Sequence, residues 1–272
     1  MDALVRLLEY GDEEVALDLA ALEVARIEYP DLDPEPFLSV LDSHARELGA
    51  KVKPDAGGPD FVAGLNRYLF ADLGFRGNID DYYDARNSCL NEVLTSRTGI
   101  PITLSVIYIE ISRRLGRPVW GVGLPGHFIV RYQDGLWGAY LDPFHEGRVV
   151  SEPECFDLAR QATGEEIEAG AATLAPVTKR QIVVRMLNNL RGIYVSKEAY
   201  PKAITTLDLL MTANPDAADD YRLRATLEIA TGRYRDAVHD LQKYLQLTPG
   251  ASDRDAVRED ISKLRDWLSR LN

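Results

Sequence analysis

Residues 124–142 read LPGHFIVRYQDGLWGAYLD, two alternating apolar runs on either side of Asp134-Gly135. An Asp-Gly pair between such runs is among the strongest short-range signals for a β-hairpin. If the loop is symmetric about these two residues, the register that follows places His127 opposite Asp142. Side chains that oppose each other directly in such a ladder have Cβ atoms about 4.5–5.5 Å apart. The turn therefore predicts a contact between an imidazole and a carboxylate.

A histidine beside an aspartate supplies two parts of a nucleophile-activating triad. The imidazole removes the proton of the nucleophile, and the carboxylate fixes the tautomer of the imidazole. The same pair also occurs as a structural hydrogen bond within a sheet, and the hairpin leaves both interpretations open. A nucleophile would have to come from elsewhere in the chain.

The composition of the 272-residue chain narrows the class of protein. Its hydrophobic content of 46% is typical of a globular protein with a sizeable core. Its net charge of −12 argues against a general nucleic-acid or anionic-membrane binder, because nothing would neutralise phosphates. One small basic cluster lies near the end of an expected helix, where cations suit the helix dipole, and we expect it to be solvated. Its members are Arg113, Arg114 and Arg117.

The apolar stretches, the first residues and the cysteines of the chain all bear on the compartment of the protein. The longest apolar stretch, residues 100–111, is too short to span a bilayer, and the first residues do not resemble a secretory signal. Two cysteines, Cys89 and Cys155, argue against a disulfide framework and suit a reducing environment. We therefore expect a cytoplasmic protein with neither nucleic-acid nor membrane partners.

Helical patterns precede the hairpin. Apolar residues recur with helical spacing at about 15–29, 34–45, 61–73 and 87–97, with breaks rich in proline, glycine or acidic residues. A further helix is expected to begin near Pro101, since proline is well tolerated in a first turn. A strand should then lead from Pro118 into the hairpin. Helices followed by an antiparallel sheet indicate the α+β class.

From about residue 181 the sequence repeats itself with a period of 34. A period of this length, with alanine, a large apolar residue four positions later and proline eight positions after that, is typical of tetratricopeptide helix pairs. The matching positions are Leu187 and Tyr221, Ile193 and Leu227, Tyr200 and Tyr234, Ala203 and Ala237, Leu207 and Leu241, and Pro215 and Pro249.

These repeats predict a second, all-α domain at residues 177–272 after a first domain at residues 1–176. Two repeats are expected, at about 185–216 and 219–250. A capping helix should follow, because each repeat needs a neighbour to bury its apolar face. Its apolar stripe is Ile261, Leu264, Leu268 and Leu271. The groove of such repeats ordinarily holds a segment of a partner protein.

Three motifs in the first domain resemble the SirB-type branch of the transglutaminase-like superfamily. They are NSCLNEVL at residues 87–94, RTGIPITL at 97–104 and GVGLPGHF at 121–128. Tetratricopeptide-like helices follow the domain in that branch, and the resemblance runs from about residue 10 to 250. It implies a papain-like domain of helices plus an antiparallel sheet, with Cys, His and Asp chemistry of acyl transfer or amide hydrolysis. It maps the histidine and aspartate onto His127 and Asp142.

The cysteine of active relatives has no clear equivalent in this chain. In those relatives it lies in the first turn of the helix that begins here at Pro101, where the helix dipole lowers the thiol pKa. Residues 101–103 contain no thiol. Cys89, about one helix upstream, remains the candidate nucleophile, whereas Cys155 is expected to pack in a peripheral helix. Thr103 and Ser105 offer hydroxyls near the expected place.

The same region offers residues that could hold a metal ion. His127, Asp142, His145 and Glu146 offer suitable ligand types. Because Asp-x-x-His on a turn after a strand is common, the sequence favours neither a metal nor another cofactor.

Two functions compete. The first is a non-catalytic or vestigial transglutaminase-like module whose helical repeats bind a protein or peptide, which the acidic charge suggests is neutral or basic. The second is a thiol acyltransferase or amidohydrolase in which Cys89 attacks a carbonyl, His127 acts as base and then acid, and Asp142 orients the imidazole. The missing thiol at the start of the expected helix favours the first.

Overall fold

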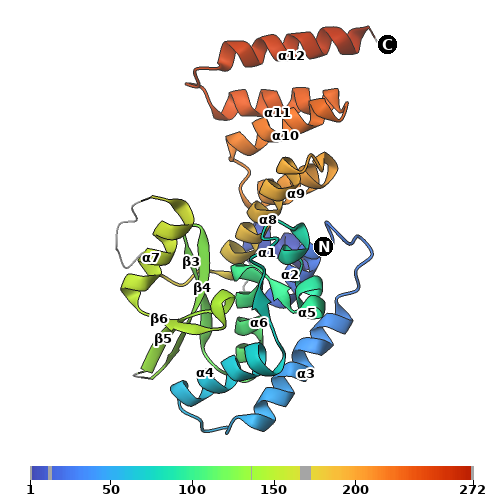
Figure 1. Ribbon diagram of the computed structural model, residues 1–272. Helices are drawn as coiled ribbons and strands as arrows, with labels where there is room; N and C mark the ends of the chain where they lie inside the picture. The colour runs from blue at the N-terminus through green and yellow to red at the C-terminus, as the bar shows by residue number, and fades with distance from the viewer. Residues whose placement is uncertain (1, 12–13, 136, 166–172, 271–272) are drawn as a thin grey trace. The chain divides into compact units, whose positions relative to one another are not determined.

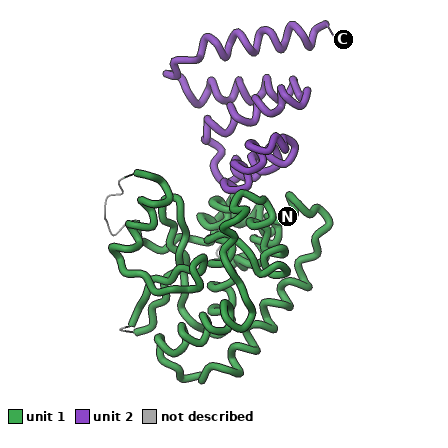
Figure 2. Tube along the Cα trace, viewed as in Figure 1, with its two compact units in different colours: residues 1–186 green, residues 187–272 purple. Residues whose placement is uncertain are grey.

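The structure is a computed structural model that describes residues 2–11, 14–135, 137–165 and 173–270 (Figure 1). The chain divides into two compact units, residues 1–186 and 187–272 (Figure 2). Each unit contains its own clusters of buried apolar side chains. No helix in the described ranges is long and apolar enough to cross a membrane.

Most of the regular secondary structure in the first unit is helical. The helices are α1 (Asp2–Tyr10), α2 (Leu17–Ala25), α3 (Glu35–Lys51), α4 (Gly58–Asn66), α5 (Leu90–Ser96), α6 (Pro101–Arg114) and α7 (Glu152–Thr163). Helix α6 is the central one, and every residue from 101 to 112 is buried. It begins as the sequence predicts, with proline in the first turn, and it ends where Gly116 adopts a φ of +68° that suits glycine.

Two segments expected to be plain helices differ in detail. After Asn66 the helix α4 continues as a π-helical segment, η1 (Arg67–Asp72). The segment expected to be one helix at 87–97 is divided between a 3₁₀ turn, η2 (Ala85–Ser88), and α5. The residue between these two elements is Cys89, and its backbone is extended, with φ −97° and ψ 112°. A short parallel pair, β1 (Arg76–Gly77) and β2 (Thr98–Gly99), flanks this region.

The main sheet is antiparallel and its strands follow one another in chain order. They are β3 (Val119–Leu124), β4 (His127–Asp134), β5 (Trp137–Asp142) and β6 (Arg148–Val150). Figure 1 shows the sheet between α7 and α6. On the α7 side, Ile129 and Tyr140 of the sheet pack with Cys155 and Leu158 of the helix. The α+β prediction is confirmed.

The hairpin of β4 and β5 forms, but its expected register is wrong by two residues. Val130 pairs with Leu141, and Asp134 pairs with Trp137. Asp134 therefore remains in the ladder, and the loop begins at Gly135, whose φ of +57° glycine adopts without strain. Because side chains alternate with a period of two, a shift of two residues keeps each side chain on its expected face.

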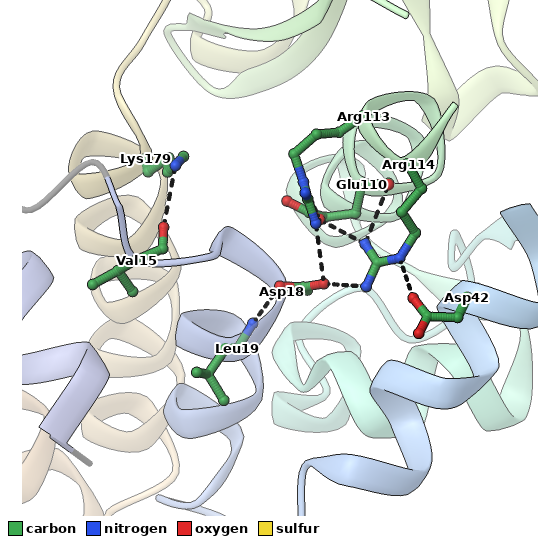
Figure 3. A network of polar contacts seen from close by, with 8 residues as sticks. All are labelled: Val15, Asp18, Leu19, Asp42, Glu110, Arg113, Arg114 and Lys179. Atoms are coloured by element: carbon green, nitrogen blue, oxygen red, sulfur yellow. Dashed lines mark hydrogen bonds and ion pairs between the residues drawn. The ribbon is translucent and has the colours of Figure 1, made fainter. Parts of the chain in front are cut away.

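A buried ionic network fixes α6 against α2 and α3 (Figure 3). Arg114 contacts Asp18 at 2.5 Å, and it reaches Glu110 and Asp42 at 2.7 Å each. Arg113 adds a second contact to Glu110 at 2.8 Å. Burial raises the pKa of Glu110, and the charge of Asp18 adds to this, against the opposing effect of the two arginines. The expectation of a solvated basic cluster is wrong for Arg114 and Arg117, whose side chains are only 13% and 14% exposed.

The second unit consists of paired helices. After α8 (Lys179–Ser196), which begins in the first unit, come α9 (Tyr200–Ala213), α10 (Ala218–Ala230), α11 (Tyr234–Leu247) and α12 (Arg254–Ser269). The repeat-related alanines Ala203 and Ala237 have no exposed surface, as the close approach of paired helices requires. Helix α12 packs on α11, and its Val257 and Ile261 are buried. The predicted helical repeats are confirmed.

Candidate functional site

Asp142 is the anchor of the candidate site. It ends β5 and opens a 3₁₀ turn, η3 (Pro143–His145). Its Oδ1 accepts a hydrogen bond from the backbone N–H of Phe144 at 3.1 Å, and the proline that follows Asp142 suits the first position of the turn. The side chain of Asp142 has no exposed surface. A fully buried carboxylate of this kind needs polar partners.

Two histidines supply those partners. His127, the first residue of β4, contacts Asp142 Oδ2 through Nε2 at 3.1 Å. His145, at the end of η3, contacts the same oxygen through Nδ1 at 2.7 Å. The three ligand-type atoms all lie within 4.8 Å of one another. We call these three residues the His–Asp–His cluster.

Two opposing effects set the pKa of Asp142 in the cluster. Burial alone would raise the pKa of Asp142, but hydrogen bonds and charge from His127 and His145 outweigh burial and hold this pKa below its usual range. The side chain of His127 is buried, whereas that of His145 is 44% exposed. The cluster therefore has one solvent-exposed edge, at His145, while the carboxylate of Asp142 is fully buried.

One aromatic ring packs against both histidines of the cluster. Phe144 lies edge-on to His127 and to His145, with ring centroids 6.2 and 5.1 Å away. Tyr82 packs in turn on Phe144 at 6.0 Å. The close approach of β1 depends on Gly77, because a Cβ at this position would lie 2.6 Å from the Phe144 ring.

Arg185 of α8 also contacts the cluster. Its Nη2 donates to the backbone oxygen of His127 at 2.6 Å, and its guanidinium lies 5.4 Å from the centre of the Phe128 ring. Burial lowers the pKa of Arg185. No sequence pattern could have placed this residue beside the hairpin, since 58 positions separate it from His127.

Cys89 lies between η2 and α5 and is the N-cap residue of α5. Its side chain is fully buried, and its thiol donates to the backbone oxygen of Ala85 at 3.5 Å. Burial raises the pKa of Tyr29, and the hydrogen bond that its hydroxyl donates to Glu92 and the charges of Glu92 and Cys89 add to this. Cys89 is not a member of the His–Asp–His cluster.

The remaining candidates from the sequence also lie outside the cluster. The hydroxyl of Thr103 accepts from Ile100 N at 3.2 Å and donates to Asn87 O at 2.8 Å, which caps α6. The hydroxyl of Ser105 is buried and has no hydrogen-bond partner among the described residues. Glu146 is exposed and is not part of the cluster.

Cys155 packs in the core between α7 and the sheet. Burial raises its pKa to about 11, and the nearby acidic charges of Glu152, Glu154 and Asp142 add to this. A thiol with such a pKa is almost wholly protonated near neutral pH and is a poor nucleophile.

Comparisons with known proteins agree with this architecture. Residues 35–188 match the family described as the transglutaminase-like superfamily, and residues 190–262 match the tetratricopeptide repeat. A UPF0162 protein of Xylella fastidiosa strain Temecula1 is 40% identical over 93% of this chain and 91% of its own length. A UPF0162 protein of Pseudomonas aeruginosa is 28% identical over 96% of this chain and 95% of its own length. The human F-box only protein 21 is 33% identical over 62% of this chain, which corresponds to 28% of that protein.

Proposed function

Because the chain belongs to the transglutaminase-like superfamily and to the UPF0162 proteins, we propose that it is a cytoplasmic, non-catalytic protein-interaction module. In this proposal the transglutaminase-like domain carries a vestigial site, and the C-terminal repeats bind a protein or peptide. The observation that carries the proposal is the full burial of Cys89, whose thiol donates to the backbone oxygen of Ala85.

Thiol catalysis needs a base within hydrogen-bond reach of the sulfur. The thiol of Cys89, the N-cap residue of α5, is fully buried and donates to Ala85 O. The first turn of α6, where a helix dipole would activate a nucleophile, begins with Pro101, and its Thr103 hydroxyl is engaged in capping the helix. These contacts support a domain that has kept the histidine and aspartate but lacks an activated nucleophile.

The charge distribution bears on the partner. Acidic and basic side chains are equal in number in residues 187–272, so residues 1–186 carry the whole net charge of −12. We therefore expect the repeats to recognise their partner through shape and apolar anchors, with little dependence on salt. Any basic segment of the same partner would be attracted to the first unit.

A hollow of about 450 Å³ between α11 and α12 is the place on the repeat where we propose that a peptide segment binds. Its wall includes the side chains of Leu245 and Ile261. Exposed polar side chains, Gln246 and Ser262 among them, form the rim. The charged side chains of Arg258, Arg265 and Asp266 also line the hollow. Apolar side chains surrounded by polar ones are the usual composition of a specific interface.

The test is a pull-down in which the 272-residue chain is the bait and its bound partner is fixed by chemical cross-linking. Three variants are compared with the wild type. Ser262→Arg fills the hollow, Ser269→Arg places the same side chain elsewhere on α12, and His127→Ala removes the histidine of the vestigial site. We expect a cross-linked partner to be lost with Ser262→Arg and retained with the other two. Loss with His127→Ala, or retention with Ser262→Arg, would contradict the proposal.

The contact between His127 and Asp142 is the observation that favours the second candidate, a thiol acyltransferase or amidohydrolase. In that case Cys89 would be alkylated rapidly by iodoacetamide near neutral pH, and His127→Ala would slow the reaction. Slow alkylation that does not depend on His127 supports the non-catalytic proposal. Digestion and mass spectrometry distinguish Cys89 from Cys155.

A further inference from the structure

We infer that the His–Asp–His cluster binds one divalent transition-metal ion, with Zn²⁺ as the reference ion. Binding of this ion is independent of the partner binding proposed for the repeats. The donors are His127 Nε2, Asp142 Oδ2 and His145 Nδ1, which lie within 4.8 Å of one another. Imidazole and carboxylate together are typical ligands of zinc and of non-haem iron.

The spacing of the donors suits such an ion. Zinc lies about 2.0–2.2 Å from nitrogen and oxygen ligands, so two ligands of a tetrahedral site are roughly 3.3 Å apart. The carboxylate oxygen of Asp142 lies 3.1 Å from the nitrogen of His127 and 2.7 Å from that of His145. Small rotations of the three side chains therefore suffice to place an ion between them.

The backbone already holds these side chains in place. Asp142 is fixed from both ends, because Phe144 N donates to its Oδ1 and Gly147 N donates to its backbone oxygen at 2.8 Å. Arg185 fixes the backbone of His127 through the bond to its carbonyl oxygen. Such supporting hydrogen bonds orient metal ligands and strengthen binding.

The charge and access of the site also favour a cation. Asp142 is a fully buried carboxylate, and a dication would compensate its charge more completely than hydrogen bonds do. The exposed edge of His145 leaves a route for the ion and for a water molecule as a further ligand. Ligation uses the lone pairs of Nε2 in His127 and Nδ1 in His145, so in the loaded site each ring carries its proton on the other nitrogen.

The sequence predicted the contact between His127 and Asp142, and it offered His145 and Glu146 as further ligand types without choosing between them. The fold places His145 against the same carboxylate oxygen and leaves Glu146 exposed. The third donor is therefore His145.

The experiment uses the full chain, freed of metal with a chelator and then exchanged into clean buffer. Zn²⁺ binding is measured by competition with a chromophoric chelator, and Co²⁺ absorption reports the ligand types. His145→Asn is the main variant, because the exposed position of His145 makes it compatible with folding. His239→Asn is the matched control, since the His239 side chain is 78% exposed and lies outside the cluster.

We expect one ion per chain in the wild type and in His239→Asn. We expect the affinity of His145→Asn to fall at least about 100-fold, because a ligand itself is lost rather than a supporting contact. Three outcomes would overturn the inference. They are no saturable binding, unchanged affinity in His145→Asn, or a Co²⁺ spectrum with thiolate charge transfer, which would assign the site to a cysteine.

Discussion

His145 Nδ1 lies 2.7 Å from Asp142 Oδ2, so a second imidazole shares the carboxylate that the hairpin presents to His127. In a thiol enzyme the aspartate serves one histidine, whose ring then faces the nucleophile. Here the carboxylate accepts from both imidazoles and from the backbone of Phe144. Asp142 therefore acts as the centre of a structural cluster in the folded protein.

The unequal burial of these residues predicts unequal costs of substitution. Asp142→Ala should lower the free energy of unfolding by about 3 kcal/mol, because several donors lose their acceptor in a buried place. His145→Ala should cost about 1 kcal/mol, since water can replace a half-exposed partner. Urea denaturation measures both values, and His239→Ala serves as the control for removing an exposed imidazole. Equal costs for the two substitutions would show that Asp142 is not the centre of the cluster.

The ionic network around α6 allows a matched comparison of two neighbouring arginines. Arg114→Ala should destabilise the protein by about 3 kcal/mol or more, because it leaves the buried carboxylates of Asp18 and Glu110 without their main cation. Arg113→Ala should cost less than about 1 kcal/mol, because this side chain is 51% exposed. Urea unfolding followed by tryptophan fluorescence gives both values. The network does not stabilise α6 if Arg114→Ala is as mild as Arg113→Ala.

Glu228 predicts a pH dependence of the repeat unit. Burial raises its pKa to about 7; Asp240 and Asp236 add to the shift, while Arg224 and Arg233 oppose it. The unfolded chain loses this proton near pH 4.5 and the folded chain near pH 7, so the folded state binds more protons between these values. Stability should therefore be greatest below pH 4.5 for this group and fall as pH rises through 7, by about 3 kcal/mol in total.

Glu228→Gln isolates this effect. The variant keeps the shape of the side chain but cannot ionise, so its stability should not fall through this group between pH 5 and pH 8. The measurement is the difference in unfolding free energy between variant and wild type at the two pH values. We expect the variant to gain on the wild type as pH rises; a constant difference would place the carboxyl pKa near its ordinary value.

Two glycines predict opposite effects of added side chains. Gly77→Ala should destabilise the protein and disturb the cluster, because the new Cβ would lie 2.6 Å from the Phe144 ring and 2.8 Å from its backbone oxygen. Gly192→Ala, inside α8, should stabilise by about 0.5–1 kcal/mol, because nothing lies within 4 Å of the new Cβ. Thermal melts of both variants test the pair. If Gly77→Ala stabilised the protein, η3 would not be in close contact with β1.

The sequence was sufficient for the features that follow from periodicity. The spacing of 34 residues predicted the helical repeats, and the alternation across Asp134-Gly135 predicted the hairpin and the shared face of His127 and Asp142. Register was less accessible, because whether Asp134 belongs to the ladder or to the loop depends on the backbone of Gly135.

Contacts between distant segments were beyond the sequence for a different reason. Arg185 reaches the backbone of His127 from another helix, and no local pattern encodes that approach. Arg114 lies in a basic run that looks solvated, and only the packing of α2 and α3 shows its buried carboxylate partners. Cys89 could be named as a candidate from the motif, but its burial against Ala85 depends on the turn that precedes α5.

The alternation of β5 has a consequence for the evolutionary divergence of this hairpin. A slide of two residues between β4 and β5 leaves the carboxylate of Asp142 on the face of His127, whereas an insertion or deletion of one residue within β5 would turn it to the other face. Lineages that retain the cluster should therefore show length changes in β5 only in even steps. Odd changes would have to be confined to the loop that starts at Gly135, where they leave the ladder intact.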